Sequence, residues 1–460
     1  MSQIRFGTDG WRAVIGEGFT FPAVESVARA HARVLKREGK KRVLVGYDRR
    51  FLSEAFARRV ADAFKEEGLE VKLAGSACTT PMVSFGVKYL GYDGGVMITA
   101  SHNPPEYNGY KIKDETGGPA PEELVKQVEE ELKRLPKERP ASYEHELQEL
   151  RRPYVKKLRE LMPLELFNER ELLLVHDAMY GTSAGLLEFI LKDTKVTVAG
   201  IRQHRDALFG GHPPEPVEKY VKITQEKVRA LNAFMGVVND GDGDRLALVD
   251  ERGSFVNTQL VYALLMLHVL KNKKMRGTVV KTVSTSYLAD RIARAYGVKL
   301  IEVPVGFKHV NRVIRSGEPV VFGGEESGGF GFPHYLPERD GTFSALMILE
   351  FLLLEDRSLS AAVNELLKNF GPAHYGRVDL RVEPEAKERI KSLKANPPEK
   401  LGPYAVKEVR TADGLKLVFD DDAWLLMRPS GTEPLVRVYA ESPSAEQTEK
   451  LLELGLKLLK

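Results

Sequence analysis

Asp240, Asp242 and Asp244 alternate with glycine in a short segment that ends at Arg245. Carboxylates so close together repel one another unless a cation neutralises them. A hard divalent cation with oxygen ligands is the simplest neutraliser, and the two glycines let the backbone turn tightly around it. Arg245 then stands beside the ion as a donor for an anionic group. The pattern therefore predicts a divalent metal site that takes part in phosphate chemistry.

A polar turn without metal and a calcium EF-hand are the alternatives for the aspartate segment. A turn would be favoured for a single Asp-Gly pair, but three alternating carboxylates favour a metal. Glu251 stands at the twelfth position counted from Asp240, where an EF-hand has its glutamate. That motif also needs glycine in place of Arg245 and helices on both sides, whereas the flanking residues 235–238 and 246–249 resemble short apolar strands. We therefore reject the EF-hand and expect that Glu251 binds no metal.

Ser101 is a second candidate for chemistry, because it lies between an apparent strand and the turn that begins at Asn103. His102 is adjacent, and Lys111 follows ten residues later. A serine in a tight loop beside cations can attack or carry a phosphoryl group. On this segment alone, an ordinary turn before proline is an equally good interpretation. No Gly-x-Ser-x-Gly segment surrounds this serine, so a serine hydrolase is poorly supported.

A third loop carries Glu325, Glu326 and Ser327 among glycines, again after an apparent strand. Carboxylates and hydroxyls share hydrogen bonds with the hydroxyl groups of sugars. The loop therefore predicts a binding site for a polyhydroxyl ligand, and a plain glycine-rich connection is the alternative.

A fourth loop contains Arg428, Ser430, Gly431 and Thr432. A guanidinium, two hydroxyls and free backbone N–H groups together form a cradle for a phosphate that does not react. Like the other three loops, this one follows an apparent strand. Because ligands of open α/β sheets bind beyond the carboxyl ends of strands, we expect one cleft that all four loops line.

Composition limits the class of protein. The chain has 460 residues, 43% hydrophobic and 29% charged, which predicts three or four domains with large cores. A net charge of +3 without a basic stripe argues against a nucleic-acid partner. Cys78 is the only cysteine, which fits a reducing compartment. The start of the chain lacks an apolar signal, and the most apolar helix, residues 260–270, is too short for a bilayer. We expect a soluble cytoplasmic protein without a membrane partner.

Strand and helix patterns alternate in three successive blocks, typical of doubly wound α/β units. Charged helices at residues 121–134 and 141–160 are expected to link the first two blocks. After Pro372 the order changes to strand, helix, several strands and a final helix, which predicts a smaller α+β domain. The expected domains are residues 1–149 with the serine loop, 150–250 with the metal loop, 251–370 with the sugar loop and 371–460 with the phosphate cradle.

Together these segments closely resemble the α-D-phosphohexomutase superfamily, the phosphoglucomutase and phosphomannomutase enzymes. The resemblance implies three related α/β domains and a TBP-like C-terminal domain around a central cleft. It covers essentially the whole chain through the segments 6–12, 99–104, 240–245, 305–308, 324–328 and 428–434.

The resemblance implies a phosphotransferase that interconverts hexose 1-phosphate and hexose 6-phosphate, with glucose or mannose as the sugar. Ser101 would be the phosphoserine, and its phosphate would hold Mg²⁺ together with the three aspartates. A hexose 1,6-bisphosphate would be the intermediate and the activator, sugar phosphates the small-molecule partners, and a monomer or homodimer the assembly. The implied catalytic residues are Ser101, Lys111, Arg12, Arg245 and His102, and the implied substrate-binding residues are Lys308, Glu325, Ser327, Arg428, Ser430, Gly431 and Thr432.

Two departures concern the sugar loop. Phosphomannomutase-like members often have methionine in place of Glu326 and histidine in place of Gly329, so the loop looks more like that of phosphoglucomutases. Phosphoglucosamine mutase, phosphopentomutase, a broad-specificity mutase, a metal-dependent phosphatase and a non-catalytic sugar-phosphate sensor are the alternatives. The absent histidine leaves the general acid/base open. Lys111 is the first candidate, since a lysine crowded by cations has a lowered pKa; the lesser candidates are His102, His309, His334 and Arg339.

Overall fold

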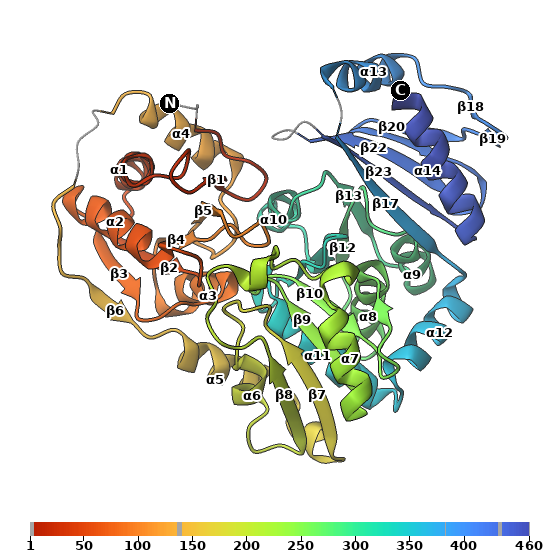
Figure 1. Ribbon diagram of the computed structural model, residues 1–460, viewed down its shortest axis with the longest axis horizontal. Helices are drawn as coiled ribbons and strands as arrows, with labels where there is room; N and C mark the ends of the chain where they lie inside the picture. The colour runs from red at the N-terminus through yellow and green to blue at the C-terminus, as the bar shows by residue number, and fades with distance from the viewer. Residues whose placement is uncertain (1–3, 136–139, 382, 431–434, 460) are drawn as a thin grey trace.

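Each of the first three domains contains a mixed β-sheet, and the fourth contains an antiparallel one (Figure 1). The computed structural model describes residues 4–135, 140–381, 383–430 and 435–459. The first and fourth domains lie at opposite sides of Figure 1, with the second and third between them. The prediction of three α/β domains followed by a smaller C-terminal domain of helix and strand is confirmed.

The first sheet has parallel strands in its middle and an antiparallel pair at one edge. β2 and β4 are almost completely buried, as expected for apolar strands with helices on both faces. In sheet order the strands are β1 Trp11–Val14, β5 Tyr107–Lys113, β4 Gly94–Ile98, β2 Arg42–Tyr47, β3 Glu70–Ala74 and β6 Glu146–Gln148. The helices are α1 Phe21–Arg37, α2 Ser53–Glu66, α3 Thr80–Leu90 and α4 Glu122–Leu132.

The expectation that residues 121–134 and 141–160 only link two domains is wrong in part. α4 belongs to the first domain, because Arg37 of α1 hydrogen-bonds with Glu131 at 2.6 Å. Residues 146–148 form β6, which adds a parallel strand to the edge of the first sheet. In the chain, α5, Arg151–Leu161, and a short helix at Leu166–Asn168 lie between the first sheet and the second.

The second and third sheets repeat the plan of parallel centre and antiparallel edge. In sheet order the second contains β11 Phe255–Val256, β10 Leu246–Val249, β9 Met235–Asn239, β7 Leu172–Asp177 and β8 Val196–Ile201, with α6 Leu186–Ile190, α7 Lys222–Leu231 and the short helices η1 Leu166–Asn168, η2 Phe209–Gly211 and η3 Glu218–Tyr220. The third contains β13 Leu300–Val303, β12 Thr278–Thr282, β14 Val320–Gly324, β15 Phe330–Phe332 and β16 Leu336–Arg339, with α8 Thr258–Lys271, α9 Leu288–Tyr296, α10 Phe307–Arg315, α11 Gly341–Leu354 and α12 Leu359–Phe370.

The fourth sheet is antiparallel throughout. In sheet order it contains β17 His374–Arg381, β23 Leu435–Ser442, β22 Trp424–Pro429, β21 Leu415–Val418 and β20 Glu408–Arg410. A separate pair, β18 Lys400–Leu401 and β19 Tyr404–Ala405, and the helices α13 Pro384–Ala395, η4 Asp420–Asp422 and α14 Ala445–Leu459 complete the domain.

The apolar core is shared by the first three domains but not by the fourth. One continuous cluster of buried residues runs from Trp11 in the first domain to Leu366 in α12. The fourth domain has its own core, built on residues such as Leu425 and Val438. A smaller cluster, which includes Tyr287 and Trp424, joins the third domain to the fourth. The fourth domain is therefore a unit with its own core, attached through a limited contact.

The most apolar helices are core helices. α8, which contains the run predicted at residues 260–270, and α11 are buried along nearly their whole length. No helix in the described part of the chain is long and apolar enough to cross a membrane.

Candidate active site

Ser101 and the aspartate loop meet where the first two domains touch. Ser101 follows β4, is buried, and has a φ of 52°, a left-handed conformation that non-glycine residues rarely adopt. Its Oγ donates a hydrogen bond to Asp240 Oδ2 at 2.7 Å and lies 3.3 Å from His102 Nδ1. The structure thus brings the predicted nucleophile to the predicted metal loop, although 139 residues separate them in sequence.

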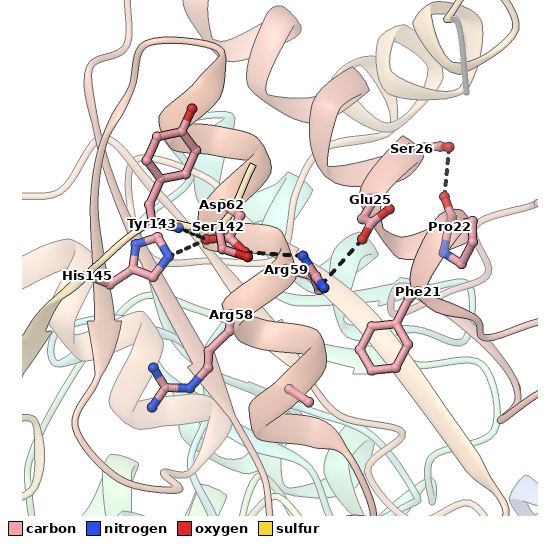
Figure 2. Close-up of a pocket in the computed structure, with 11 residues that line it drawn as sticks. Phe21, Pro22, Glu25, Ser26, Arg58, Arg59, Asp62, Ser142, Tyr143 and His145 are labelled. Atoms are coloured by element: carbon pink, nitrogen blue, oxygen red, sulfur yellow. Dashed lines mark hydrogen bonds and ion pairs between the residues drawn. The ribbon is translucent and has the colours of Figure 1, made fainter. Parts of the chain in front are cut away.

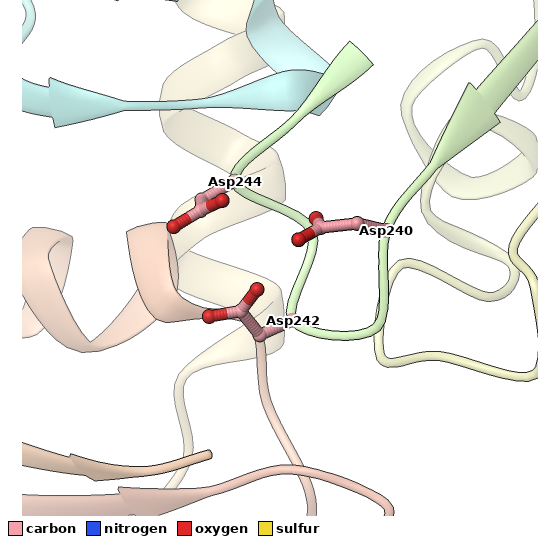
Figure 3. Close-up of side chains that lie close together, drawn as sticks. All are labelled: Asp240, Asp242 and Asp244. Carbon is pink, nitrogen blue, oxygen red and sulfur yellow. The ribbon is translucent and has the colours of Figure 1, made fainter. Parts of the chain in front are cut away.

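The three aspartates converge in a buried space. One carboxylate oxygen from each lies within 4.8 Å of the others (Figure 3). Protein donors hold both oxygens of Asp240 but only one oxygen each of Asp242 and Asp244. The backbone N–H of Arg245 donates to Asp240 Oδ1 at 3.1 Å, and Lys111 Nζ donates to Oδ2 of Asp242 at 2.8 Å and of Asp244 at 2.9 Å.

The remaining aspartate oxygens fit a divalent cation. Asp242 Oδ1 and Asp244 Oδ1 are buried and have no hydrogen-bond partner. Asp240 Oδ2 faces the Ser101 hydroxyl. Because a buried carboxylate oxygen without a partner is costly, this set of oxygens favours a hard cation such as Mg²⁺. Burial and repulsion from the other two aspartates also raise the pKa of Asp240 well above its ordinary value.

Lys111 lies among carboxylates, so the expectation that cations crowd it is wrong. Its Nζ is 2.8 Å from Asp9, 2.8 Å from Asp242 and 2.9 Å from Asp244. Burial alone would lower the pKa of Lys111, but these three carboxylates outweigh burial and raise it. In this arrangement Lys111 is an ammonium group that neutralises the acidic cluster.

Arg339 in β16 connects the metal loop to the sugar loop. Its guanidinium contacts Asp9 at 2.7 Å, Asp244 at 2.8 Å and Glu325 at 3.3 Å. Burial would lower the pKa of Arg339, but Asp244 and Asp9 outweigh burial and raise it well above its ordinary value. Arg339 therefore stays charged, which removes it from the list of general acids and bases.

The position of Arg339 explains why the sugar loop has glycine where some family members have histidine. A Cβ atom at Gly329 would lie 2.3 Å from Arg339 Cδ, too close for any side chain. The loop itself is a tight turn in which Glu325 N–H donates to the Gly329 carbonyl at 2.9 Å. Burial raises the pKa of Glu325 to about 7, although Arg339 opposes the rise.

Of the candidate histidines, only His102 lies at Ser101. Its pKa is held well below the ordinary value by burial and by the nearby charges of Arg245 and Arg12, so it is a neutral imidazole. Burial lowers the pKa of His309, and it lowers the pKa of His334 to about 4. His334 is exposed, and its ring lies at the edges of the Phe332 and Phe343 rings, away from Ser101.

The two predicted arginines flank the serine loop. Arg12 donates to Asn103 Oδ1 at 2.6 Å and lies 3.6 Å from Asp9. The Nε of Arg245 is buried without a hydrogen-bond partner, which leaves a donor beside Asp240. Glu251, for which we expect no metal, accepts hydrogen bonds from Ser358 Oγ and from the Ser360 backbone N–H at the start of α12.

Other predicted binding residues lie away from the aspartates. Lys308 in α10 pairs with Glu122 of the first domain at 3.0 Å. Arg428 in β22 donates from Nε to Asp413 at 2.7 Å, and the Ser430 backbone N–H donates to the Leu435 carbonyl at 2.8 Å. Glu326 and Ser327 lie in the same turn as Glu325, and Gly431 and Thr432 lie outside the described residues.

Arg50 is a functional residue that the sequence interpretation missed. Its fully buried guanidinium donates to the carbonyls of Ser101 and Asn103 at 2.6 Å each, to that of Pro104 at 2.8 Å and to that of Tyr107 at 3.1 Å. It therefore holds the left-handed serine loop in place. Its position in the sequence could have identified it, because the polar residues 48–50 directly follow β2. The four candidate loops follow their strands in the same way.

Thr80 was missed as well, and it orients a metal-loop carboxylate across the domain boundary. Its Oγ1 donates to Asp242 Oδ2 at 2.6 Å, and its backbone N–H donates to the Asp242 carbonyl at 2.9 Å. No local pattern identifies such a residue, because its role depends on the packing of α3 against another domain.

A cavity of about 630 Å³ lies elsewhere, between α1, α2 and residues 142–145 (Figure 2). Arg59 lies 3.5 Å from Glu25 and 3.7 Å from Asp62, and His145 Nε2 lies 2.8 Å from Asp62. Within this cavity Arg59 and His145 are thus paired with its carboxylates, and none of the predicted site residues lines it.

The first prediction concerns metal binding. Calorimetric titration of the unphosphorylated protein with Mg²⁺ should show one site, and Asp242→Asn should weaken it at least tenfold, because one negative ligand is lost. Glu251→Gln is the matched control and should bind like the wild type. Equal affinity in the wild type and in Asp242→Asn would contradict the assignment.

The second prediction concerns Glu325 and pH. The folded protein binds the Glu325 proton more tightly than the unfolded chain, since the pKa rises from 4.5 to about 7. This group therefore favours folding most below pH 4.5, and the contribution is lost as the pH rises through 7. Glu325→Gln should become more stable relative to the wild type as the pH rises. The difference in their free energies of unfolding should increase by about 3 kcal/mol from pH 5 to pH 8. Denaturant unfolding at both values tests this, and a pH-independent difference would refute it.

Comparison with known proteins identifies the family. Models of the phosphoglucomutase/phosphomannomutase family match four parts of the chain: alpha/beta/alpha domain I at residues 3–139, domain II at 152–253, domain III at 258–370 and the C-terminal domain at 378–454. A phosphoglucomutase/phosphomannomutase of Thermococcus kodakarensis is 34% identical over 99% of this chain and 98% of its own length. A probable phosphoglucosamine mutase of Methanopyrus kandleri is 32% identical over 97% of this chain and 95% of its own.

A solved structure agrees with these relatives. The crystal structure of a proposed phosphomannomutase from Thermus thermophilus has a TM-score of 0.89 and 35% sequence identity, and the match covers 100% of this chain and 99% of that one. The chain therefore belongs to the phosphoglucomutase/phosphomannomutase family of the α-D-phosphohexomutase superfamily, and it is a phosphohexomutase, an isomerase.

Proposed function

We propose that this enzyme interconverts the 1-phosphates and 6-phosphates of glucose and mannose through a phosphorylated Ser101 and a hexose 1,6-bisphosphate. The observation that carries the proposal is the 2.7 Å contact between Ser101 Oγ and Asp240 Oδ2. It sets a buried hydroxyl beside three carboxylates that fit a divalent cation, two of which have an oxygen without a hydrogen-bond partner. Positioning and charge neutralisation are the main requirements of phosphoryl transfer.

Mg²⁺ is the metal that we propose, held by Asp240, Asp242, Asp244 and the phosphate on Ser101. When bound, it neutralises part of the charge on the phosphoryl oxygens. Lys111 and Arg245 add positive charge beside the aspartates.

In the first transfer, a hydroxyl of the bound sugar phosphate attacks the phosphorus on Ser101. The bond between that phosphorus and Ser101 Oγ breaks, a bond to the sugar oxygen forms, and the proton of the sugar hydroxyl ends on Ser101 Oγ, which becomes a hydroxyl again. The product is a bisphosphate, which turns over in the site. In the second transfer Ser101 Oγ attacks the phosphorus of the other phosphate. The bond from that phosphorus to its sugar oxygen breaks, the sugar oxygen takes up the proton that Ser101 loses, and the sugar leaves with its phosphate moved. An added hexose 1,6-bisphosphate acts as activator because it can transfer a phosphoryl group to an unphosphorylated Ser101.

We propose that the sugar loop and the phosphate cradle divide the recognition of substrate. Glu325 and Ser327 contact sugar hydroxyls, since carboxylates and hydroxyls suit such groups. Lys308 and the cradle, which consists of Arg428, Ser430, Gly431 and Thr432, hold the phosphate that does not react. A guanidinium with hydroxyls binds a phosphate dianion through its charge and does not depend on the configuration of the sugar. Either phosphate of the bisphosphate can therefore occupy the cradle.

Phosphoglucosamine mutase is the second candidate function, and the relative from Methanopyrus kandleri favours it. We place glucose and mannose first because the sugar loop has Glu326 and no glutamine. Assays of glucose, mannose and glucosamine phosphates side by side separate the two candidates.

The third prediction is that Ser101 carries the transferred phosphoryl group. Peptide mapping of the protein incubated with glucose 1,6-bisphosphate should find phosphate on Ser101, and Ser101→Ala should lose mutase activity completely. Ser84→Ala is the matched control, because Ser84 is also buried and its hydroxyl has no hydrogen-bond partner to lose. Full turnover by Ser101→Ala would refute the mechanism.

The fourth prediction separates the two recognition loops. Arg428→Ala should lower kcat/KM for glucose and mannose phosphates by a similar factor, equivalent to about 2–3 kcal/mol for a lost charged hydrogen bond. Glu325→Gln should change the ratio between the two sugars as well as the rate. Measuring kcat/KM for both sugars in both variants tests the assignment. A changed sugar ratio in Arg428→Ala together with an unchanged ratio in Glu325→Gln would show that the roles are reversed.

A further inference from the structure

One carboxylate oxygen of Asp413 serves two loops that come from different domains. Asp413 Oδ2 accepts a hydrogen bond from Arg428 Nε at 2.7 Å and another from the Val305 backbone N–H at 2.8 Å. Arg428 belongs to the proposed phosphate cradle, and Val305 begins the loop that leads to Lys308. A single oxygen therefore fixes the distance between two parts of the proposed substrate site.

The local fold places Asp413 for this contact. Asp413 and Gly414 form the turn between β20 and β21, and Gly414 has a φ of +93°. A Cβ atom at Gly414 would lie 2.5 Å from the Met427 carbonyl oxygen and 3.0 Å from Arg428 Cα. Only glycine allows the turn to lie so close to β22, and this closeness brings the Asp413 carboxylate to the arginine.

The charge pair is well shielded from water. The side chain of Arg428 is 11% exposed and that of Asp413 is 20% exposed. Burial would lower the pKa of Arg428, but the Asp413 carboxylate outweighs burial and raises it. Asp413 binds the guanidinium through Nε, so the two terminal nitrogens, the pair that can face a dianion, stay outside this contact.

The loop on the other side of Asp413 reaches toward the first domain. Gly306, with a φ of +123°, begins α10, and Lys308 in the first turn pairs with Glu122 of the first domain at 3.0 Å. Asp413 thus lies between the cradle arginine and a loop that touches two other domains.

We infer that Asp413 is a positioning residue for substrate phosphate: it aims the terminal nitrogens of Arg428 and fixes them relative to the 305–308 loop, so that both meet one sugar phosphate. This inference rests on the proposed function of Arg428 and Lys308. A pre-aimed guanidinium loses less conformational entropy when it binds a phosphate, so the benefit appears in binding. This gain in binding is the same whichever sugar carries the phosphate.

Asp422 provides a matched control within the same interface. Its carboxylate lies 2.9 Å from Arg291 Nε and 3.3 Å from Arg294 of α9, so it also joins the fourth domain to the third. Asp422 lies in η4 and makes no contact with Arg428 among the described residues. Its loss removes an interdomain ion pair and leaves the cradle arginine untouched.

The experiment compares Asp413→Ala, Asp413→Asn and Asp422→Asn with the wild type. We expect Asp413→Ala to raise KM for glucose 1-phosphate and mannose 1-phosphate alike by about tenfold while kcat changes by less than about threefold. Asp413→Asn, which keeps an acceptor oxygen, should recover part of the loss. Asp422→Asn should keep the wild-type KM. A wild-type KM in Asp413→Ala, or an equal rise in Asp422→Asn, would overturn the inference.

A binding measurement separates this inference from the proposed function. Calorimetry with glucose 6-phosphate should show the same order of affinities, with the wild type and Asp422→Asn tightest and Asp413→Ala weakest. If the affinities for glucose 6-phosphate follow this order but the wild type has no mutase activity, the proposed reaction fails and the role of Asp413 stands. If Asp413→Ala binds as tightly as the wild type while mutase activity is intact, the inference alone fails. A wild-type protein that binds no sugar phosphate would refute both.

Discussion

Buried negative charge must be neutralised where the first three domains meet, and much of the site follows from that requirement. Asp240, Asp242 and Asp244 are fully buried, and Asp9, whose side chain is 13% exposed, lies beside them. Removing the counter-charge of such a group costs several kcal/mol. The counter-charges come from different domains, so neutralisation also holds the domains in register: Lys111 is in β5 of the first domain, and Arg339 is in β16 of the third.

Neutralisation by protein groups is incomplete in a way that suits the reaction. Lys111 and Arg339 occupy one side of the aspartates and leave Oδ1 of Asp242 and of Asp244 without a partner. Arg50 holds the serine loop through backbone carbonyls, which keeps the Ser101 hydroxyl facing this side. The fourth domain stands apart, with its own core and a contact in which Lys416 lies 4.7 Å from the Tyr287 ring and 4.5 Å from the Trp424 ring. The proposed phosphate cradle is thus built on a different unit from the proposed nucleophile and metal loop.

The sequence predicted features whose meaning is local. The aspartate loop and the four-domain order are contiguous patterns that spacing and periodicity predict. The serine loop, which by itself fitted an ordinary turn equally well, was assigned through the family resemblance. The pKa of Lys111 was predicted in the wrong direction, because its neighbours in space, Asp9 and the aspartate loop, are distant in sequence. Arg50 and Thr80 were missed because their roles depend on how loops and helices pack. The clash between a side chain at position 329 and Arg339 is likewise visible only in three dimensions.

We infer that Ser101 and the three aspartates form one divalent metal site. Anomalous diffraction from crystals soaked in Mn²⁺, with Ser101 phosphorylated, tests it most directly. The account predicts one strong peak within bonding distance of an oxygen from each of Asp240, Asp242 and Asp244 and of the phosphate on Ser101. A fully occupied ion elsewhere in the molecule, with these four groups unligated at saturating Mn²⁺, would contradict it.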